Sequence, residues 1–208
     1  MVVLVHGLWF RAWAMHMLAK RLKRADFLTA GFSYPSRRFS LPELASQLRA
    51  FIGQPATRTV HFVGHSMGGL VVLAMLNEFD DLPAGRVVLL GSPVQGSSVA
   101  RRAAGYPGGG SLFGRSGPTL QQGYSRLPAN REVGLIIGDK GVGLGRITGG
   151  FDGPSDGTVA HSESYLPGAH GKVILPTTHT GLVWSKRVSR QTIEFLNSGN
   201  FLPDDTAG

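Results

Sequence analysis

The pattern of apolar positions divides the chain into short continuous runs and longer stretches with helical periodicity. Runs typical of buried strands lie at residues 2–5, 27–34, 59–63, 86–90, 132–137 and 172–175. Helical patterns lie at residues 14–24, 40–51, 68–79 and 183–196. The second of these has a capping-box start, because Ser40 is followed three residues later by Glu43. Strands separated by helix-length crossovers predict an α/β fold with about six mostly parallel strands and helices on both faces.

Two long segments interrupt this alternation and are rich in glycine. They cover residues 92–130 and 140–156, and each follows the carboxyl end of a predicted strand. Open α/β sheets bind their ligands at that edge, so we expect a lid or pocket rim here and not a linker. Leu112 and Phe113 in the first segment either face a lipid surface or pack onto the core. With 208 residues, the chain suits a single domain over residues 1–208 with no large cap domain.

Composition excludes several classes of protein. Hydrophobic residues make up 42% of the chain, yet no apolar stretch approaches the roughly 18–20 residues needed to span a bilayer. The opening MVVLVHG lacks the features of a signal peptide, so we expect a cytoplasmic protein. The absence of cysteine excludes disulfides, thiolate catalysis and cysteine-based zinc sites.

The chain is strongly basic, with a formal net charge of +8. Its Lys and Arg residues are nevertheless spread along the sequence and cluster only at residues 20–24 and 37–38. A basic helix face is more typical of a solvated surface than of a nucleic-acid site, so we expect no nucleic-acid partner. The charge remains compatible with anionic surfaces or substrates.

The candidate chemistry begins at Ser66, in the stretch HFVGHSMGGL. A G-x-S-x-G pattern between a strand and a helix forces an abrupt turn that pushes the serine hydroxyl out above the sheet. The following helix N-terminus adds partial positive charge where an oxyanion would form. The pattern also occurs by chance, and Ser66 could simply cap the helix. The partners that a nucleophile needs therefore decide between the two interpretations.

A serine hydroxyl is a weak nucleophile until a base takes its proton. His179 follows the last predicted strand, where such a base is expected, whereas His170 precedes that strand. His161 lies close to the candidate acids and remains an alternative, and His65 is held beside the serine itself. The chain contains seven histidines, at positions 6, 16, 61, 65, 161, 170 and 179.

The base in turn needs a carboxylate that fixes its tautomer, and the order along the chain is serine, acid, histidine. Asp139, Asp152 and Asp156 all follow the fifth predicted strand, and sequence mechanics separate them only weakly. An oxyanion needs backbone N–H donors as well. Met67 follows the serine, and Gly7 permits a turn that aims the amide of Leu8. We expect no metal and no organic cofactor.

Taken together, the chain resembles a small bacterial lipase/esterase of the α/β-hydrolase superfamily. The matching blocks are VVLVHGLW, VHFVGHSMGGLVV, VVLLGSPVQGSSVA, PSDGTVAHSES and THTGLVWS, in that order. The resemblance implies Ser66 as nucleophile, His179 as base and, among the three aspartates, Asp156 as the acid. It also implies the amides of Leu8 and Met67 as the oxyanion hole.

The block HGLWF departs from the family pattern, in which small residues usually follow His-Gly. Trp9 and Phe10 therefore either line the acyl pocket or pack against the first helix. We predict a serine carboxylic-ester hydrolase that forms an acyl-enzyme on a small-molecule ester or lipid, with transient contact to a lipid surface. The alternatives are an amidase, thioesterase or acyltransferase with the same triad, and a catalytically silent binding protein.

Overall fold

The computed structural model describes residues 1–55, 57–142, 151 and 153–203. In this part of the chain, six strands form one sheet in the order β2-β1-β3-β4-β5-β6, and every neighbouring pair is parallel. All six predicted strands are confirmed. Their bounds are β1 (Val2–Val5), β2 (Thr29–Phe32), β3 (His61–His65), β4 (Val87–Leu90), β5 (Val133–Gly138) and β6 (Gly171–Leu175).

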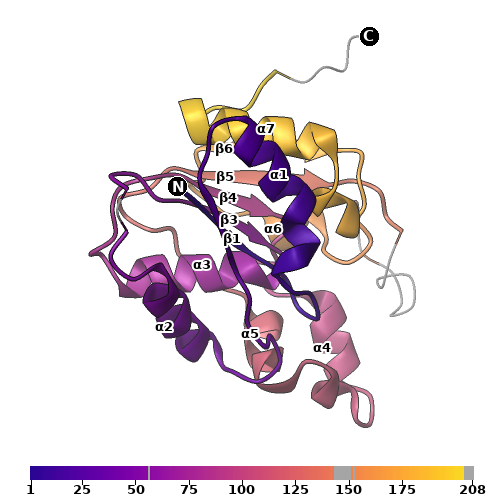
Figure 1. The fold of residues 1–208 in the computed structure, drawn as a ribbon. Helices are drawn as coiled ribbons and strands as arrows, with labels where there is room; N and C mark the ends of the chain where they lie inside the picture. Colours follow the sequence, from indigo (N-terminus) through magenta and orange to yellow (C-terminus); the bar gives the residue numbers. More distant parts are fainter. Residues whose placement is uncertain (56, 143–150, 152, 204–208) are drawn as a thin grey trace.

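Helices cover both faces of this sheet, as predicted. The helices α1 (His16–Arg24) and α7 (Lys186–Ser198) lie on one face, and α2 (Leu41–Ile52) and α3 (Met67–Glu78) lie on the other (Figure 1). The predicted capping box of α2 is present, because the Glu43 carboxylate accepts from the backbone N–H of Ser40 at 2.7 Å. Short 3-10 helices precede α1 and α7, namely η1 (Ala12–Met15) and η5 (Thr180–Val183).

The last helix begins three residues later than its apolar pattern predicts. Residues 180–183 form the separate helix η5, and α7 starts at Lys186 because the Ser185 side chain accepts from the backbone N–H of Val188 at 3.3 Å. Val183 is buried in the turn before the helix instead of lying on the helix. The apolar spacing therefore extends beyond the start of the helix, which the capping hydroxyl of Ser185 sets.

The alternation of side chains in the strands produces two hydrophobic cores, one under each helix layer. In β1, Val2 and Leu4 pack towards α1 and α7, whereas Val3 and Val5 pack towards α2 and α3. The helix α3 is buried at every position from Met67 to Leu76, so it is the most enclosed helix of the described chain. The element that follows Ser66 is therefore held on all sides.

The segment 92–130, expected as an irregular covering, contains helices. These are α4 (Ser98–Ala104), η2 (Gly109–Leu112), η3 (Gly114–Ser116) and α5 (Gly117–Gln122). They are too short to show apolar periodicity in a glycine-rich sequence. Phe113 is 5% exposed and packs onto the core, whereas Leu112 is 51% exposed. The segment 140–156 includes residues 143–150 and 152, which lie outside the described residues.

The strand order reverses direction between β1 and β3. The chain runs from β1 outward to β2, returns, and then continues from β3 in the other direction. Loops leaving β1 and β3 therefore diverge at their carboxyl ends, which is where open α/β sheets bind ligands. A last short helix, α6 (His161–Ser164), follows β5 near this edge. None of the described helices has the length and apolar character required to cross a bilayer.

Candidate active site

Ser66 occupies the abrupt turn between β3 and α3. Its backbone has φ 54° and ψ −127°, a conformation that a non-glycine residue rarely adopts. The turn is held in place from the strand side, because the Ser66 N–H donates to the carbonyl of Leu90 in β4 at 2.9 Å. Gly68 is required for close approach, since a Cβ there would lie 2.2 Å from the carbonyl oxygen of Val5. The strained turn thus rests on the neighbouring strands.

His179 and Asp156 come from two different loops and meet in the interior. The Nδ1 atom of His179 lies 2.6 Å from Oδ2 of Asp156, and the two side chains are 9% and 1% exposed. A carboxylate can only accept, so Nδ1–H is the donor and Nε2 is left free to take a proton. This is the tautomer that a general base for a serine requires.

Backbone groups hold the Asp156 carboxylate from its other side. Its Oδ1 accepts from the N–H groups of Thr158 at 2.9 Å and Val159 at 2.8 Å. The N–H of His179 donates to the carbonyl of Asp156 at 2.9 Å. The aspartate therefore fixes both the ring and the backbone of the histidine. Its carboxylate accepts three hydrogen bonds, from the N–H groups of Thr158 and Val159 and from Nδ1–H of His179, and these offset the cost of burying it.

His65 supports the same histidine through its backbone. Its Nε2 lies 3.1 Å from the carbonyl of His179, and the two rings are 4.7 Å apart between centroids. Because a carbonyl only accepts, Nε2 of His65 carries the proton. Burial, followed by the nearby His179, lowers the pKa of His65 to about 3, so this ring is neutral at physiological pH.

Ser66 and His179 line one cavity of about 240 Å³. Most of its wall is apolar, and Leu8, Trp9 and Phe10 from the loop after β1 contribute to it. The segment 92–130 supplies much of the remaining wall, through Pro93, Ser97, Val99, Ala100, Phe113 and Leu120.

The loop after β1 passes directly over Ser66. A Cβ on Gly7 would lie 2.9 Å from the Cβ of Ser66, so only glycine fits there. The His6 ring fixes this loop: Nε2 accepts from the N–H of Tyr34 at 3.2 Å, so Nδ1–H donates to the carbonyl of Gly7 at 2.8 Å. Burial lowers the pKa of His6, which keeps this arrangement neutral.

The two amides expected to form an oxyanion hole belong to elements beside Ser66, namely the start of α3 and the loop after β1. Met67 is the first residue of α3, where a backbone N–H has no acceptor within the helix. Leu8 follows Gly7 in the loop above the serine. In the part of the chain that the structure describes, neither N–H has a hydrogen-bond acceptor. Both are therefore available to a developing negative charge.

The alternative base, His161, and the alternative acid, Asp139, contact each other and not the Asp156–His179 pair. Nε2 of His161 lies 3.2 Å from Oδ1 of Asp139 and 3.0 Å from the carbonyl of Gly138. His170 lies at the other end of the sheet, where Nδ1 accepts from the N–H of Val133 at 3.3 Å. Asp152 lies outside the described residues.

Two residues at this edge were not singled out by the sequence. Gly91 follows β4, with φ 52°, and a Cβ there would lie 2.8 Å from Oδ2 of Asp156 and 3.2 Å from Nδ1 of His179. Glu163 is 6% exposed and accepts from the N–H of Ala160 at 3.0 Å and from that of Ser98, which opens α4. It thereby joins the cavity wall to the turn that carries Asp156. The contacts of Gly91 with the Asp–His pair and of Glu163 with Ser98 join residues distant in sequence, and a local pattern gives no sign of them.

Solved structures of similar fold include bacterial esterases and lipases. The lipase BlEst2 of Bacillus licheniformis in its mature form has a TM-score of 0.74 and 20% identity, covering 94% of this chain and 90% of that one. The metagenomic carboxyl esterase MGS0156 has a TM-score of 0.69 and 20% identity, with 86% and 64% covered. The carboxylesterase CesB (YbfK) of Bacillus subtilis has a TM-score of 0.62 and 12% identity, with 96% and 84% covered.

No functionally curated protein matches the chain. The model of the alpha/beta hydrolase family, in contrast, matches residues 2–185, which include the strained turn at Ser66, the Asp156 turn and the loop of His179. This match covers most of the chain and agrees with the six-stranded parallel sheet, with the helices on both of its faces and with the strained turn at Ser66. The chain therefore belongs to the alpha/beta hydrolase family.

Proposed function

We propose that this protein is a serine carboxylic-ester hydrolase in which Ser66, His179 and Asp156 form the catalytic triad. The observation that carries the proposal is a strained serine and a carboxylate-bound histidine on the wall of one apolar cavity. A serine that merely capped α3 would need neither partner. The match to the family supports a hydrolase, and the choice of an ester bond follows from the lipases and esterases of similar fold.

In the first half of the reaction, Oγ of Ser66 attacks the ester carbonyl while Nε2 of His179 takes the serine proton. The carbonyl oxygen becomes an oxyanion, which accepts hydrogen bonds from the amides of Leu8 and Met67. The tetrahedral intermediate collapses by breaking the bond to the alcohol oxygen, and His179 returns the proton to that oxygen. The alcohol leaves, and the acyl group remains on Ser66.

In the second half, water takes the place of the alcohol. His179 removes a proton from the water, whose oxygen attacks the acyl carbonyl, and the same two amides stabilise the new oxyanion. The bond to Oγ then breaks, the proton on His179 passes to Ser66, and the carboxylic acid leaves. Asp156 keeps its hydrogen bond to Nδ1–H throughout and stabilises the transient imidazolium of His179.

The cavity suggests which acyl groups are accepted. Its volume of about 240 Å³ is below the range of about 300–1,000 Å³ typical of sites for drug-sized ligands. We therefore infer a preference for short acyl chains, with Phe113 and Leu120 as the apolar wall. A series of p-nitrophenyl esters from acetate to decanoate measures this preference, and we expect kcat/KM to peak at a short chain.

Hydrolysis of p-nitrophenyl butyrate by the wild type and by Ser66→Ala tests the proposal. We expect turnover by the wild type and a loss of about 10³-fold or more in the variant, since the nucleophile is removed. Circular dichroism and thermal unfolding of both proteins show whether the variant is folded. Equal activity in both proteins, or no activity of the wild type on any ester, would overturn the proposal.

A further inference from the structure

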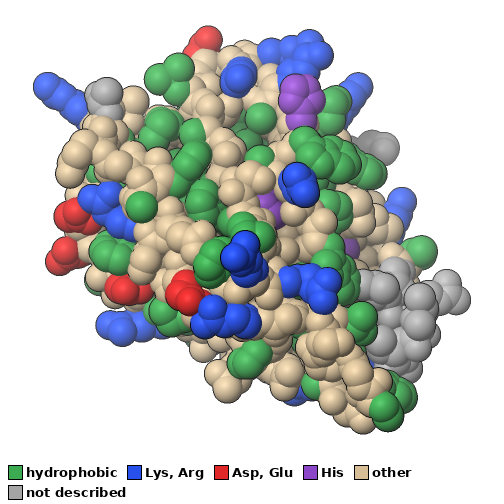
Figure 2. All heavy atoms as spheres, turned by 60° about the horizontal axis from the view of Figure 1, so that its bottom comes forward, with side chains coloured by type: hydrophobic (Ala, Val, Ile, Leu, Met, Phe, Trp, Pro, Cys, Tyr) green, Lys and Arg blue, Asp and Glu red, His purple; other side chains and the backbone are tan. Residues whose placement is uncertain are grey.

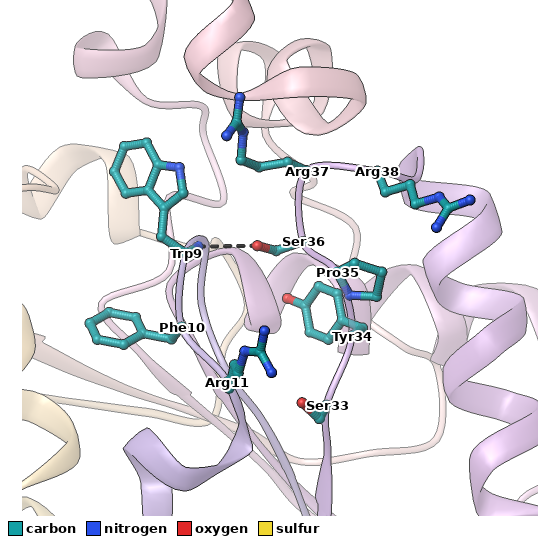
Figure 3. A pocket seen from close by; sticks show the side chains of 9 residues that line it. All are labelled: Trp9, Phe10, Arg11, Ser33, Tyr34, Pro35, Ser36, Arg37 and Arg38. Carbon is teal, nitrogen blue, oxygen red and sulfur yellow. Dashed lines mark hydrogen bonds between the residues drawn. The ribbon is translucent and has the colours of Figure 1, made fainter.

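A second hollow lies on the other side of the loop that follows β1. It has a volume of about 430 Å³ and opens to solvent. Its walls are the loop after β1 and the segment after β2 (Figure 3). Among the described residues, Trp9 and Phe10 are the two that line both hollows. We call this hollow the arginine groove, because Arg11, Arg37 and Arg38 are among its lining residues.

The loop between the two hollows has two chemically different sides. The Phe10 side chain turns away from the groove, and its ring meets that of His65 at 5.9 Å between centroids. Trp9 also points away, with its ring 5.8 Å from that of Phe113. Arg11, in contrast, extends its guanidinium into the groove (Figure 3). The aromatic side of the loop faces the cavity lined by Ser66 and His179, and the cationic side faces the groove.

In the part of the chain that the structure describes, the Arg11 guanidinium has no counter-ion. Among the described residues, its side chain has no hydrogen bond, ion pair or ring contact. Ser33, an exposed residue after β2, lies across the groove from it (Figure 3). No acidic residue in the described chain lines the groove. The guanidinium fork therefore has its donors available to a carboxylate or phosphate.

The rim of the groove reinforces the positive potential. Arg37 points outward and donates to the carbonyl of Ser111 at 2.7 Å, while Arg38 lies 5.8 Å from the ring centroid of Phe39 (Figure 3). Both keep their charge close to the groove without filling it. On the face shown in Figure 2, Lys and Arg side chains gather near the centre, and acidic ones lie mostly toward the left of the view. Such a field attracts anions from solution.

The groove also lies within reach of the proposed reaction centre. Gly7 passes within 2.9 Å of the Ser66 side chain, measured from the Cβ position it lacks. Arg11 follows four residues later, and four residues of extended chain span at most about 14 Å. An ester whose acyl part fills the apolar cavity has its alcohol part outside it, beside this loop.

We propose that the arginine groove binds an anionic group on the alcohol part of the ester, with Arg11 as the residue that contacts it. This inference rests on the proposed ester hydrolase and narrows its substrates to esters of phosphate- or carboxylate-bearing alcohols. Such a group belongs either to a dissolved small ester or to a lipid headgroup, and the chemistry that Arg11 recognises is the same in both.

Two matched substrate pairs test the proposal. The first is 4-(butyryloxy)benzoate against its methyl ester, which differ in one negative charge on the phenol that leaves. The second is phosphatidic acid against diacylglycerol, both with the same short acyl chains and each dispersed in phosphatidylcholine vesicles. For each pair we compare kcat/KM of the anionic substrate with that of the neutral one, in the wild type and in variants.

Arg11→Gln is expected to lower the anionic-to-neutral ratio of kcat/KM by about tenfold or more, because a charge-assisted hydrogen bond is lost. Arg11→Lys keeps the charge without the fork and should fall between. Arg58→Gln, which removes an exposed arginine before β3 at the opposite end of the sheet, is the matched control and should keep the wild-type ratio.

A fall in the ratio for the dissolved pair identifies a small anionic ester, and a fall only for the vesicle pair identifies a lipid headgroup. The same ratio in wild type and Arg11→Gln for both pairs would overturn the inference. The proposed function fails in a different way, since the wild type would then hydrolyse neither the neutral nor the anionic esters.

Discussion

Two Asp–His pairs lie near the carboxyl edge of the same sheet, and they differ in the distance between their partners and in the exposure of their side chains. Asp156 and His179 meet at 2.6 Å with side chains 1% and 9% exposed. Asp139 and His161 meet at 3.2 Å with side chains 48% and 19% exposed. Only the first pair lines the cavity that contains Ser66, through His179.

The contrast shows that preorganisation, more than proximity, distinguishes a candidate catalytic pair. Asp156 accepts two backbone N–H bonds in addition to the one from His179, so its orientation is set before a substrate arrives. The other pair is partly open to water, where ion pairs contribute only about 0–1 kcal/mol. A pair that is open to water does not hold its side chains in one orientation, whereas a buried and anchored pair holds the histidine ring in one tautomer.

Replacing one carboxylate at a time tests which of the two pairs takes part in catalysis. Asp156→Asn is expected to lower kcat on p-nitrophenyl butyrate by about 10³–10⁴-fold, because the amide no longer holds the required tautomer of His179. Asp139→Asn is the matched control and should stay within about threefold of the wild type, as expected of a substitution outside the transition state. A large loss in Asp139→Asn with a small one in Asp156→Asn would reverse the assignment.

Gly91→Ala perturbs the anchored pair without removing either member. The added methyl would lie 2.6 Å from Cδ1 of Leu182 and 2.8 Å from Oδ2 of Asp156, at a backbone φ of 52°. We expect a loss of about 10–100-fold in kcat, because small displacements of catalytic groups are costly. Gly110→Ala, where an added Cβ meets nothing within 4 Å, controls for the substitution itself. Equal kinetics in both variants would show that Gly91 does not constrain the pair.

Glu163 connects the anchored pair to the cavity wall, and its removal is expected to loosen both. Glu163→Gln replaces one carboxylate oxygen by an amide NH₂, which cannot accept from the N–H of Ser98 or Ala160. We expect the free energy of unfolding to fall by about 1–3 kcal/mol and kcat/KM to fall several-fold. Glu78→Gln, at the exposed end of α3, is the control for urea unfolding and kinetics. An unchanged stability in Glu163→Gln would contradict this role.

The neutral His65 behind His179 predicts a pH effect on stability. Its pKa is lowered by burial to about 3, whereas an unfolded histidine has a pKa of about 6.5. Between these values the unfolded chain binds a proton that the folded chain does not, so acidification destabilises the fold. From pH 7 to pH 5 the loss due to His65 is about 2 kcal/mol.

Urea unfolding of the wild type and His65→Gln at pH 7 and pH 5 measures this effect. The variant should lose less stability on acidification, by about 2 kcal/mol. His16→Gln, which removes an exposed histidine at the start of α1, separates the buried ring from histidine content in general. The same loss in the wild type and His65→Gln would contradict a neutral buried ring.

The sequence predicted the frame of this site better than its details. Continuous apolar runs located all six strands, and β1 was placed to the residue, because a buried parallel strand leaves an unbroken hydrophobic run. The helices of residues 92–130 were missed, since they are short and depend on packing against the core. Ser97, for example, caps α4 by accepting from the N–H of Ala100 at 3.2 Å.

The choice of the acid among three aspartates shows the limit of what residue spacing can predict. Three aspartates followed β5, and their spacing alone did not separate them. Asp156 differs from Asp139 by its contacts with a histidine 23 positions later in the chain. Those contacts arise when two loops fold together, so the spacing of the aspartates does not carry them. It was the resemblance of the block PSDGTVAHSES to the family pattern that pointed to Asp156. The assignment of Asp156 to catalysis remains a prediction.

Covalent labelling shows whether Ser66 is a reactive nucleophile. Wild type and Ser66→Ala are treated with a fluorophosphonate, and the intact mass and the modified peptide are determined. We predict one adduct, on Ser66, which is absent from Ser66→Ala and forms more slowly in Asp156→Asn than in Asp139→Asn. No adduct on the folded wild type, or an adduct on another residue, would contradict it.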